Sequence, residues 1–324
     1  MKARVLRYSR EAVREGGLII KGGGLVAFPT ETVYGLGASV FNPNAVARIF
    51  EVKRRPRFDP IIVHVASPEE VERVCLEVGR DARMLIRRFW PGPLTLVLPK
   101  SDVVPDIVTA GLETVAVRMP SHPVALELLR EAGVPVAAPS ANLFGRLSPT
   151  TARHVKEQIG GEIDLIIDGG RCPIGVESTV LDLTGEPTVL RPGGLPVEEI
   201  EKAIDRVKIS PISRVPRSPG QLPRHYSPRT PIRILKGEEP KIPEGVRVGL
   251  LAYRQPEIKP PFEMVKVLSP RGDLREAAAN LFSLLHELDK AGLDVIYVEP
   301  VPEIGLGRAI MDRLRKAEGI GETP

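Results

Sequence analysis

Clusters of hydroxyl-bearing and cationic side chains recur at the ends of apolar, strand-like or helix-like stretches of the 324-residue chain. The clusters are PTETVYGLG at 29–37, KRRPR at 53–57, RMPSHP at 118–123, PSAN at 139–142, EST at 177–179 and RPGG at 191–194. Because α/β sheets bind ligands outside the ends of their strands, we expect these groups to form one site. Hydroxyls combined with cations suit a substrate that carries phosphate or carboxylate groups.

Each cluster, taken alone, also has a structural explanation. The basic run that begins at Lys53 can complement the negative end of a helix dipole, and Ser140 or Asn142 can cap a helix or form a turn. Arg118 can belong to an ordinary surface ion pair, and His64, inside an apolar strand, can be a core histidine. The same combination at five or six places favours a binding site over these separate explanations.

Standard nucleotide-binding and metal-binding motifs are missing from the sequence. No GxxxxGK[ST] motif occurs, and the glycines at 22–24 precede a strand, so we expect them to form a tight turn. The two cysteines, Cys75 and Cys172, cannot form a CxxC metal site, and Cys75 is expected in the core. The five histidines show no HExxH spacing, which argues against a structural metal.

Composition is that of an ordinary globular protein, with 42% hydrophobic and 27% charged residues. No apolar stretch approaches the roughly 18 residues that cross a bilayer, and the N-terminal sequence is charged. We therefore expect a cytoplasmic protein without a membrane partner. The net charge of +4 permits ligands that carry phosphate without indicating a nucleic-acid-binding protein.

The order of apolar stretches predicts an α/β protein with a large twisted mixed sheet and a second, smaller α/β domain. Strands are expected at 24–28, 60–65, 94–98, 114–118, 134–138, 163–167, 178–182 and 188–191, with helices that begin at Asn44 and Ser121. Farther along, strands at 246–251 and 295–298 and helices at 274–291 and 308–317 indicate a Rossmann-like unit. We predict a catalytic domain at 1–206 and a C-terminal domain at 232–324.

The stretch between them, 207–231, is expected to be a linker. It contains six prolines and five basic residues but no acidic residue. Proline-rich linkers are usually extended. The single sign of charge suggests that this linker contacts an anionic ligand.

Taken together, the motifs resemble the YrdC family of threonylcarbamoyl-adenylate synthases in its longer, two-domain form. Further matching segments are PIIVHV at 60–65, STV at 178–180, PRHYSP at 223–228 and GLGRAIMDRLRKA at 305–317. The resemblance implies that ATP, L-threonine and bicarbonate or CO2 give threonylcarbamoyl-AMP and diphosphate. Other enzymes then transfer the threonylcarbamoyl group to an adenosine next to the anticodon of tRNA.

The resemblance also implies a role for each matching residue. Lys53 and Arg55 are the catalytic candidates that stabilise the transferring phosphate. Threonine binding falls to Thr32, His64, Arg118, Ala138 and Ser178, with Arg118 on the carboxylate. ATP binding falls to Arg55, Asp59, Thr114, Ser140, Asn142, Ser148, Arg191 and Tyr226, and Tyr226 reaches back from the linker to cover the nucleotide. Mg²⁺ is expected to arrive with ATP, and no protein nucleophile is needed because carboxylated threonine attacks the α-phosphorus.

Asp59 departs from the family pattern, which often has Asn at this position. A carboxylate there brings negative charge towards a polyphosphate, so the residue could instead bind the ribose or Mg²⁺. Its role stays open, and the nearby Arg54 and Arg57 can offset its charge.

Two other functions remain to be weighed. A carbamoyltransferase of the hydrogenase-maturation type would be much longer and rich in cysteine, whereas this chain has two cysteines. A double-stranded RNA-binding or tRNA-binding translation factor without catalysis fits the basic charge, although aromatic residues make up only 4% of the chain. The oligomeric state stays open. So does the job of the second domain, which could support the linker, bind an effector or dock the downstream transferase.

Overall fold

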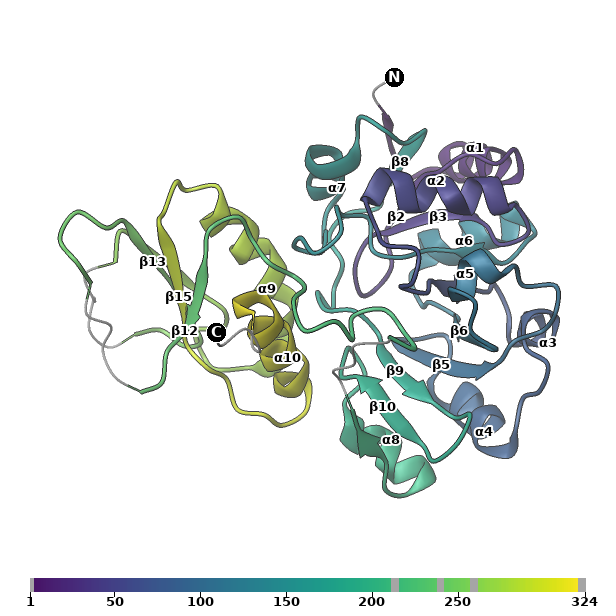
Figure 1. Cartoon of the computed structure of the whole chain (residues 1–324). Helices are drawn as coiled ribbons and strands as arrows, with labels where there is room; N and C mark the ends of the chain where they lie inside the picture. Colours follow the sequence, from purple (N-terminus) through teal and green to yellow (C-terminus); the bar gives the residue numbers. More distant parts are fainter. Residues whose placement is uncertain (1–2, 211–215, 238–241, 257–261, 320–324) are drawn as a thin grey trace.

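The computed structural model describes residues 3–210, 216–237, 242–256 and 262–319. Two α/β bodies lie side by side and are joined by a loop (Figure 1). Part of the expected linker, residues 211–215, lies outside the described residues. Within the described ranges, no helix has the length and apolar character needed to cross a bilayer.

The first body is built on a sheet of eleven strands, counted over the described residues, in the order β1-β8-β2-β3-β7-β4-β6-β5-β9-β10-β11. The strands are β1 (Arg4–Arg7), β2 (Val26–Phe28), β3 (Gly35–Ser39), β4 (Ile62–His64), β5 (Leu94–Pro99), β6 (Thr114–Arg118), β7 (Val136–Ala137), β8 (Leu165–Asp168), β9 (Thr179–Asp182), β10 (Thr188–Arg191) and β11 (Lys208–Ile209). Neighbours β4 and β6 run parallel, whereas β2 and β3 run antiparallel. The predicted mixed sheet is therefore confirmed.

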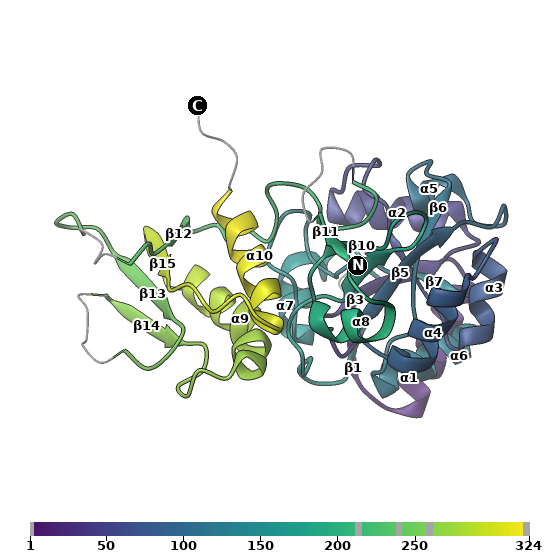
Figure 2. The same ribbon diagram turned by 90° about the horizontal axis from the view of Figure 1, so that it is seen from below.

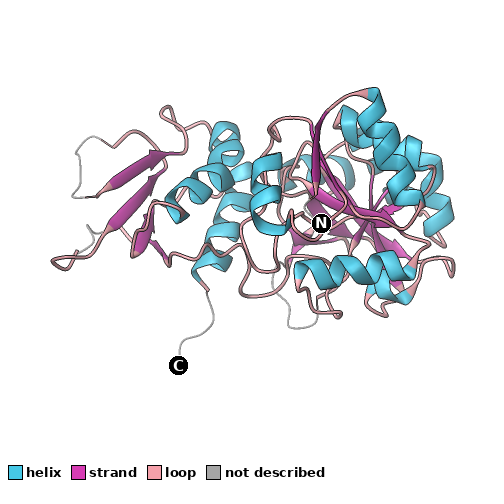
Figure 3. Cartoon of the chain, turned by 90° about the horizontal axis from the view of Figure 1, so that it is seen from above, coloured by secondary structure: helices cyan, strands magenta, loops and turns pink. Residues whose placement is uncertain are grey.

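Helices cover both faces of this sheet (Figure 3). They are α1 (Arg10–Lys21), α2 (Pro43–Lys53), α3 (Val71–Val74), α4 (Arg80–Phe89), α5 (Asp106–Thr109), α6 (Pro123–Ala132), α7 (Ala152–Ile159) and α8 (Val197–Ile204), with a 3₁₀ turn η1 (Pro68–Glu70). Alternate strand residues point to opposite faces. Val26 and Phe28 accordingly pack with α1 and α6, whereas Ala27 packs with α2 and the helices of the other face.

One region of the α1/α6 face is formed by strand residues alone. The cluster consists of Ile62, Val97, Ala116, Val180 and Leu190, from β4, β5, β6, β9 and β10. Ala138 lies beside it, since its backbone N–H donates to the carbonyl of Ile62 at 2.9 Å. This strand-only surface carries the site described below.

Two helix starts differ from the expected positions. Asn42, not Asn44, caps α2 by accepting a hydrogen bond from the N–H of Ala45, and His122, not Ser121, caps α6. In both helices a proline occupies the first helical position, where its fixed φ and missing N–H are favourable, and it sets the start one residue after the cap. Gly23 adopts φ +84° in the turn after α1, which confirms the expected tight turn.

The second body has four strands, within the described residues, in the order β12-β15-β13-β14. They are β12 (Ile232–Ile234), β13 (Val248–Ala252), β14 (Met264–Val267) and β15 (Val295–Val298), and all three pairings are parallel. Helices α9 (Leu274–Asp289) and α10 (Leu306–Glu318) lie between this sheet and the first body (Figure 2). The second α/β domain is thus as expected, and it faces its neighbour with helices.

Candidate active site

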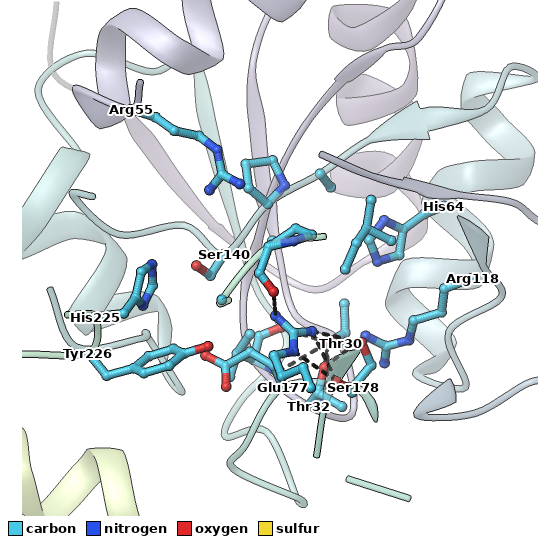
Figure 4. Close-up of a pocket in the computed structure, with 18 residues that line it drawn as sticks. Thr30, Thr32, Arg55, His64, Arg118, Ser140, Glu177, Ser178, His225 and Tyr226 are labelled. Atoms are coloured by element: carbon cyan, nitrogen blue, oxygen red, sulfur yellow. Dashed lines mark hydrogen bonds between the residues drawn. The ribbon is translucent and has the colours of Figure 1, made fainter. Parts of the chain in front are cut away.

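A cleft lies over the strand-only surface. The linker covers this cleft. Among the residues that the structure describes, eighteen line it: Thr30, Thr32, Val33, Gly35, Arg55, Ile62, His64, Arg118, Ala138, Pro139, Ser140, Glu177, Ser178, Arg191, Pro219, Gly220, His225 and Tyr226. Pro219, Gly220, His225 and Tyr226 come from the linker. The others come from strands and from the loops before or after them, except Arg55, which follows α2 (Figure 4).

Strand geometry brings His64 and Arg118 together. Ile62 and His64 point to the same face of β4 because side chains alternate along a strand. In the parallel pairing of β4 with β6, His64 lies opposite Arg118. Both residues end their strands, so the carboxyl ends of β4 and β6 supply one side of the cleft.

Arg118 is held in a fixed orientation by three partners. Its Nη1 donates to the hydroxyl of Thr32 at 3.0 Å, its Nε donates to the carbonyl of Gly92 at 3.1 Å, and its Nη2 donates to Glu31 at 2.5 Å. Arg118 and Glu31 are both buried. Thr32 is fixed in turn by Thr30, whose Oγ1 lies 2.8 Å from that of Thr32. The result is a rigid guanidinium beside a hydroxyl, which matches a carboxylate next to a second polar group.

Arg191 and Ser178 form a second fixed unit. Arg191 donates to the carbonyl oxygen of Ser178 through Nε and Nη2, at 3.1 and 3.0 Å, and to the Ser178 hydroxyl at 3.1 Å. Its Nη1 reaches the carbonyl of Pro219 in the linker at 3.2 Å. The end of β10, the start of β9 and the linker are therefore joined at one guanidinium.

Arg55 and Ser140 lie on the side of the cleft opposite Arg118, next to His225 and Tyr226 (Figure 4). The guanidinium of Arg55 donates to the carbonyls of Asp59 and Pro60, at 3.1 and 2.7 Å. These contacts hold the charged group at the edge of the cleft.

The charge balance of the lining favours an anionic ligand. Three arginines line the cleft, whereas Glu177 is the only acid among its lining residues. Burial, followed by the charge of Arg118, lowers the pKa of His64 to about 3, and burial lowers the pKa of His225 well below its usual value. Both imidazoles are therefore neutral at pH 7, so the cationic groups among the lining residues are the three guanidinium groups.

The linker is anchored on both sides of the cleft. Tyr226 adopts φ +60° and is 1% exposed. Its ring lies 5.8 Å from that of Phe282 in α9, and Arg313 in α10 lies over it at 5.1 Å. The N–H of His225 donates to the carbonyl of Lys316 in α10 at 3.1 Å. The loop that covers the cleft is thus packed against the second domain.

The structure brings together nine of the residues expected from the sequence. All five candidates for threonine binding line the cleft, namely Thr32, His64, Arg118, Ala138 and Ser178. Four candidates for ATP binding do so as well, namely Arg55, Ser140, Arg191 and Tyr226. Figure 4 shows that His64 and Arg118 lie on one side and Arg55, Ser140 and Tyr226 on the other.

Five further candidates do not line the cleft, and four of them support residues that do. Lys53 was expected to face phosphate, but its Nζ donates to the carbonyls of Ser140 and Asn142, at 2.5 Å each. Asn142 donates to the carbonyls of Leu143 and Arg146 and so closes a turn. Lys53 and Asn142 therefore hold the loop that presents Ser140.

The remaining three candidates, Asp59, Ser148 and Thr114, are also not among the lining residues. Asp59 is paired with Arg55, and the hydroxyl of Ser148 donates to Glu177. Thr114 begins β6, four residues before Arg118, which is about 13 Å at the usual rise of a strand. Asp59 and Ser148 thus fix lining residues, whereas Thr114 lies towards the other end of its strand.

The sequence did not assign roles to several residues that shape the site. Glu177 directly precedes Ser178, and Thr30 is the first residue of TET in the first motif, so their place beside assigned residues was their only signal. Arg313 had a stronger signal, because it follows Ala309 and Ile310 at the spacing of an apolar helix stripe. An arginine at a core position of a helix indicates a buried ion pair.

Two family models match the chain. The model of the Sua5, YciO and YrdC proteins, described as "Telomere recombination", matches residues 18–193. The model described as "Threonylcarbamoyl-AMP synthase, C-terminal domain" matches residues 195–319.

Curated relatives and a solved structure are similar to the chain over nearly its whole length. The threonylcarbamoyl-AMP synthase of Pyrococcus abyssi is 49% identical over 318 residues, which cover 93% of this chain and 92% of that protein. The threonylcarbamoyl-AMP synthase of Bacillus subtilis is 44% identical over 321 residues, with coverage of 95% and 93%. The crystal structure of P. abyssi Sua5 complexed with L-threonine has a TM-score of 0.91 at 47% identity and covers 98% of both chains.

Proposed function

The chain belongs to the Sua5/YrdC family in its two-domain form, and on that premise we propose that its cleft performs the family's reaction. The family, the mixed α/β fold and the enzyme class expected from the sequence are confirmed. The function is that of a threonylcarbamoyl-AMP synthase. L-threonine, bicarbonate and ATP give threonylcarbamoyl-AMP, diphosphate and water, and the enzyme is a nucleotidyltransferase because it moves an adenylyl group.

The observation that carries this proposal is the separation of the cleft into two halves. One half presents the fixed guanidinium of Arg118 with the hydroxyls of Thr32 and Ser178. The other presents Arg55, Ser140 and Tyr226. A threonine bound through its carboxylate in the first half directs its amine towards a nucleotide bound in the second.

The chemistry needs positioning and charge stabilisation rather than a protein nucleophile. The threonine amine adds to the carbon of CO2, derived from bicarbonate, and loses a proton to give an N-carboxylate. A carboxylate oxygen then attacks the α-phosphorus of ATP, and the bond to the bridging oxygen of diphosphate breaks. Holding both reactants in one cleft can lower the barrier by roughly 7–11 kcal/mol. Arg55 and Arg191 supply positive charge where negative charge develops.

The nucleotide half binds ATP as its magnesium complex. Mg²⁺ enters with the polyphosphate and neutralises part of its charge, so that it is part of the substrate. Lys53 serves the same half by fixing the loop that presents Ser140, and its own charge lies behind that loop. Asp59 acts on the phosphates through Arg55.

The linker covers the bound nucleotide and excludes water from it. Tyr226 and His225 line the nucleotide half, and Gly220 approaches Arg191 so closely that an added Cβ would lie 2.9 Å from its Cδ. Because the linker packs this closely over the cleft, it must move aside when substrates enter. The basic residues of the linker suit such contact with a polyphosphate.

The product is a mixed anhydride, which calls for a downstream transferase that accepts it and modifies tRNA in the cytoplasm. The alternative of an RNA-binding factor without catalysis is not favoured, because the polar groups converge inside a cleft that the linker covers and the similar curated proteins are threonylcarbamoyl-AMP synthases. Direct contact with tRNA or with the transferase complex would use other surfaces of the chain.

A simple experiment tests the proposed function. The protein is incubated with MgATP, bicarbonate and L-threonine, and diphosphate release is followed with each component omitted in turn. Release that requires all of them supports the proposal. Tight tRNA binding by a folded protein, without threonine-dependent release of diphosphate, would favour the non-catalytic alternative.

A further inference from the structure

Glu177 presents an electrostatic problem for a site that binds a polyphosphate. It is the only acid among the lining residues, it is 5% exposed, and it directly precedes Ser178. An unpaired carboxylate beside ATP would repel the phosphates, and this repulsion is strong where water is excluded.

The second domain supplies the countercharge. Arg313, on α10, donates through Nε to Glu177 at 2.9 Å and through Nη1 to the carbonyl of Pro192 at 2.7 Å. Its side chain is 1% exposed. Burial alone would raise the pKa of Glu177, but the charges of Arg313 and Arg191 and the hydrogen bond from Ser148 lower it to about 2. Glu177 is therefore ionised and paired at pH 7.

These two contacts of Arg313 lie next to residues of the cleft, and its Nη1 also donates to Asp312 on the same helix at 2.6 Å. Glu177 is followed by Ser178 at the start of β9, and Pro192 follows Arg191 at the end of β10. One guanidinium from the second domain thus bridges the two strand ends that present Ser178 and Arg191. Lys316, one turn farther along α10, donates to the carbonyl of Gly220 in the linker at 2.7 Å.

We propose that Arg313 is a positioning residue for the nucleotide half of the site, through which the second domain neutralises Glu177 and fixes Arg191. The inference rests on the proposed function, because it names what the second domain contributes to ATP binding. Removal of Arg313 leaves a buried, uncompensated carboxylate that opposes the polyphosphate, whereas threonine binds mainly through Arg118 in the other half.

Four variants test this role in the full-length protein: Arg313→Met, Glu177→Gln, the double variant and Arg308→Met. Arg308 is a matched control on the same helix, since its Nε makes a half-exposed ion pair across the domain boundary with Glu198 at 3.3 Å and does not touch the cleft. We expect Arg313→Met to raise the KM for ATP about tenfold or more and the KM for threonine about twofold or less. Adding Glu177→Gln to Arg313→Met should return the KM for ATP most of the way to the wild-type value. Arg308→Met should change neither KM.

Recovery of the KM for ATP in the double variant distinguishes a role of Arg313 in neutralising Glu177 from a role in packing alone. The inference would be overturned if Arg313→Met raised the KM for ATP and the KM for threonine equally. It would also be overturned if the added Glu177→Gln did not lower the KM for ATP again. If Arg313→Met does not fold, Arg313→Lys and the double variant still test the charge argument, because both keep the pair neutral overall: both should leave the KM for ATP within about threefold of the wild-type value, and a tenfold rise in both would overturn the inference. A wild-type protein that made no product would overturn the proposed function instead, and calorimetric binding of ATP by the same variants would still test the role of Arg313.

Discussion

Arg55 and Asp59 form a buried ion pair at the edge of the cleft, with 2.9 Å between Nη2 and Oδ2. Both side chains are at most 3% exposed. Arg55 lines the cleft, whereas Asp59 lies behind it. The carboxylate that departs from the family pattern therefore holds a guanidinium that lines the cleft.

Asp59→Asn should lower stability and yet tighten ATP binding. Loss of the carboxylate leaves Arg55 buried without its countercharge, which costs roughly 3–5 kcal/mol of unfolding free energy. The same loss removes a negative charge next to the polyphosphate, so the KM for ATP should fall several-fold. Thermal unfolding with and without MgATP measures both effects, and the control is Asp106→Asn, which breaks an exposed pair with Lys100. A higher KM for ATP would contradict this prediction and would show that the hold of Asp59 on Arg55 outweighs the repulsion by its charge.

Arg118→Lys should weaken threonine binding selectively. A lysine keeps the charge but loses the planar fork that contacts Thr32 and Glu31 at the same time. We expect the KM for threonine to rise at least tenfold, on the scale of one buried charged hydrogen bond, while the KM for ATP changes little. An equal rise in the KM for threonine and the KM for ATP would contradict the assignment of Arg118 to the threonine half.

Tyr226→Ala should weaken retention of the nucleotide more than binding of threonine. The ring packs against His225, Phe282 and Arg313, and its loss removes much of the side-chain packing between the linker and the second domain. Tyr226→Phe is the matched control for the ring, because it keeps the packing and removes only the hydroxyl. Calorimetric titration with ATP measures the effect, and unchanged ATP affinity in Tyr226→Ala would count against a covering role for the linker.

A stacked pair of histidines between the domains predicts loss of stability in weak acid. The rings of His154, on α7, and His286, on α9, lie 4.0 Å apart. Burial, and then the neighbouring His286, lowers the pKa of His154 from 6.5 to about 3, and burial lowers that of His286. Below pH 6.5 the unfolded chain binds more protons than the folded one, so stability is complete above that pH and falls as the pH drops towards 3.

Thermal unfolding between pH 5 and 7 checks the histidine effect, because Glu177, with its low pKa, titrates below that window. His154→Asn keeps an acceptor for the N–H of Thr150 but removes a titrating ring. The unfolding temperature of the wild type should fall more steeply with decreasing pH than that of the variant. Parallel curves would show that the histidine pair does not cause the loss.

The sequence predicted the strands that carry the site better than the contacts between them. β6 and β10 were placed at their observed bounds because turn residues flank short apolar runs. The five threonine candidates meet because each lies in, or next to, a strand, and the alternation of side chains along a strand decides which face of the sheet each one reaches. Local pattern was sufficient for these residues.

Contacts between segments that are far apart in the chain could not be predicted from the sequence. Lys53 looks like a free cation at a helix end, but the fold places the carbonyls of Ser140 and Asn142 around its amine. Glu177 and Arg313 are 136 residues apart and lie in different domains, so no local pattern pairs them. Such pairs depend on how the two bodies dock, which spacing along a chain does not encode.

Product analysis with labelled bicarbonate tests the central claim most directly. The protein is incubated with MgATP, L-threonine and ¹³C-bicarbonate, quenched rapidly and examined by mass spectrometry. We expect threonylcarbamoyl-AMP whose mass is greater by one unit than that of the product from unlabelled bicarbonate, formed in step with diphosphate. A folded protein that gave no such adenylate, or gave threonyl-AMP without the label, would contradict the account.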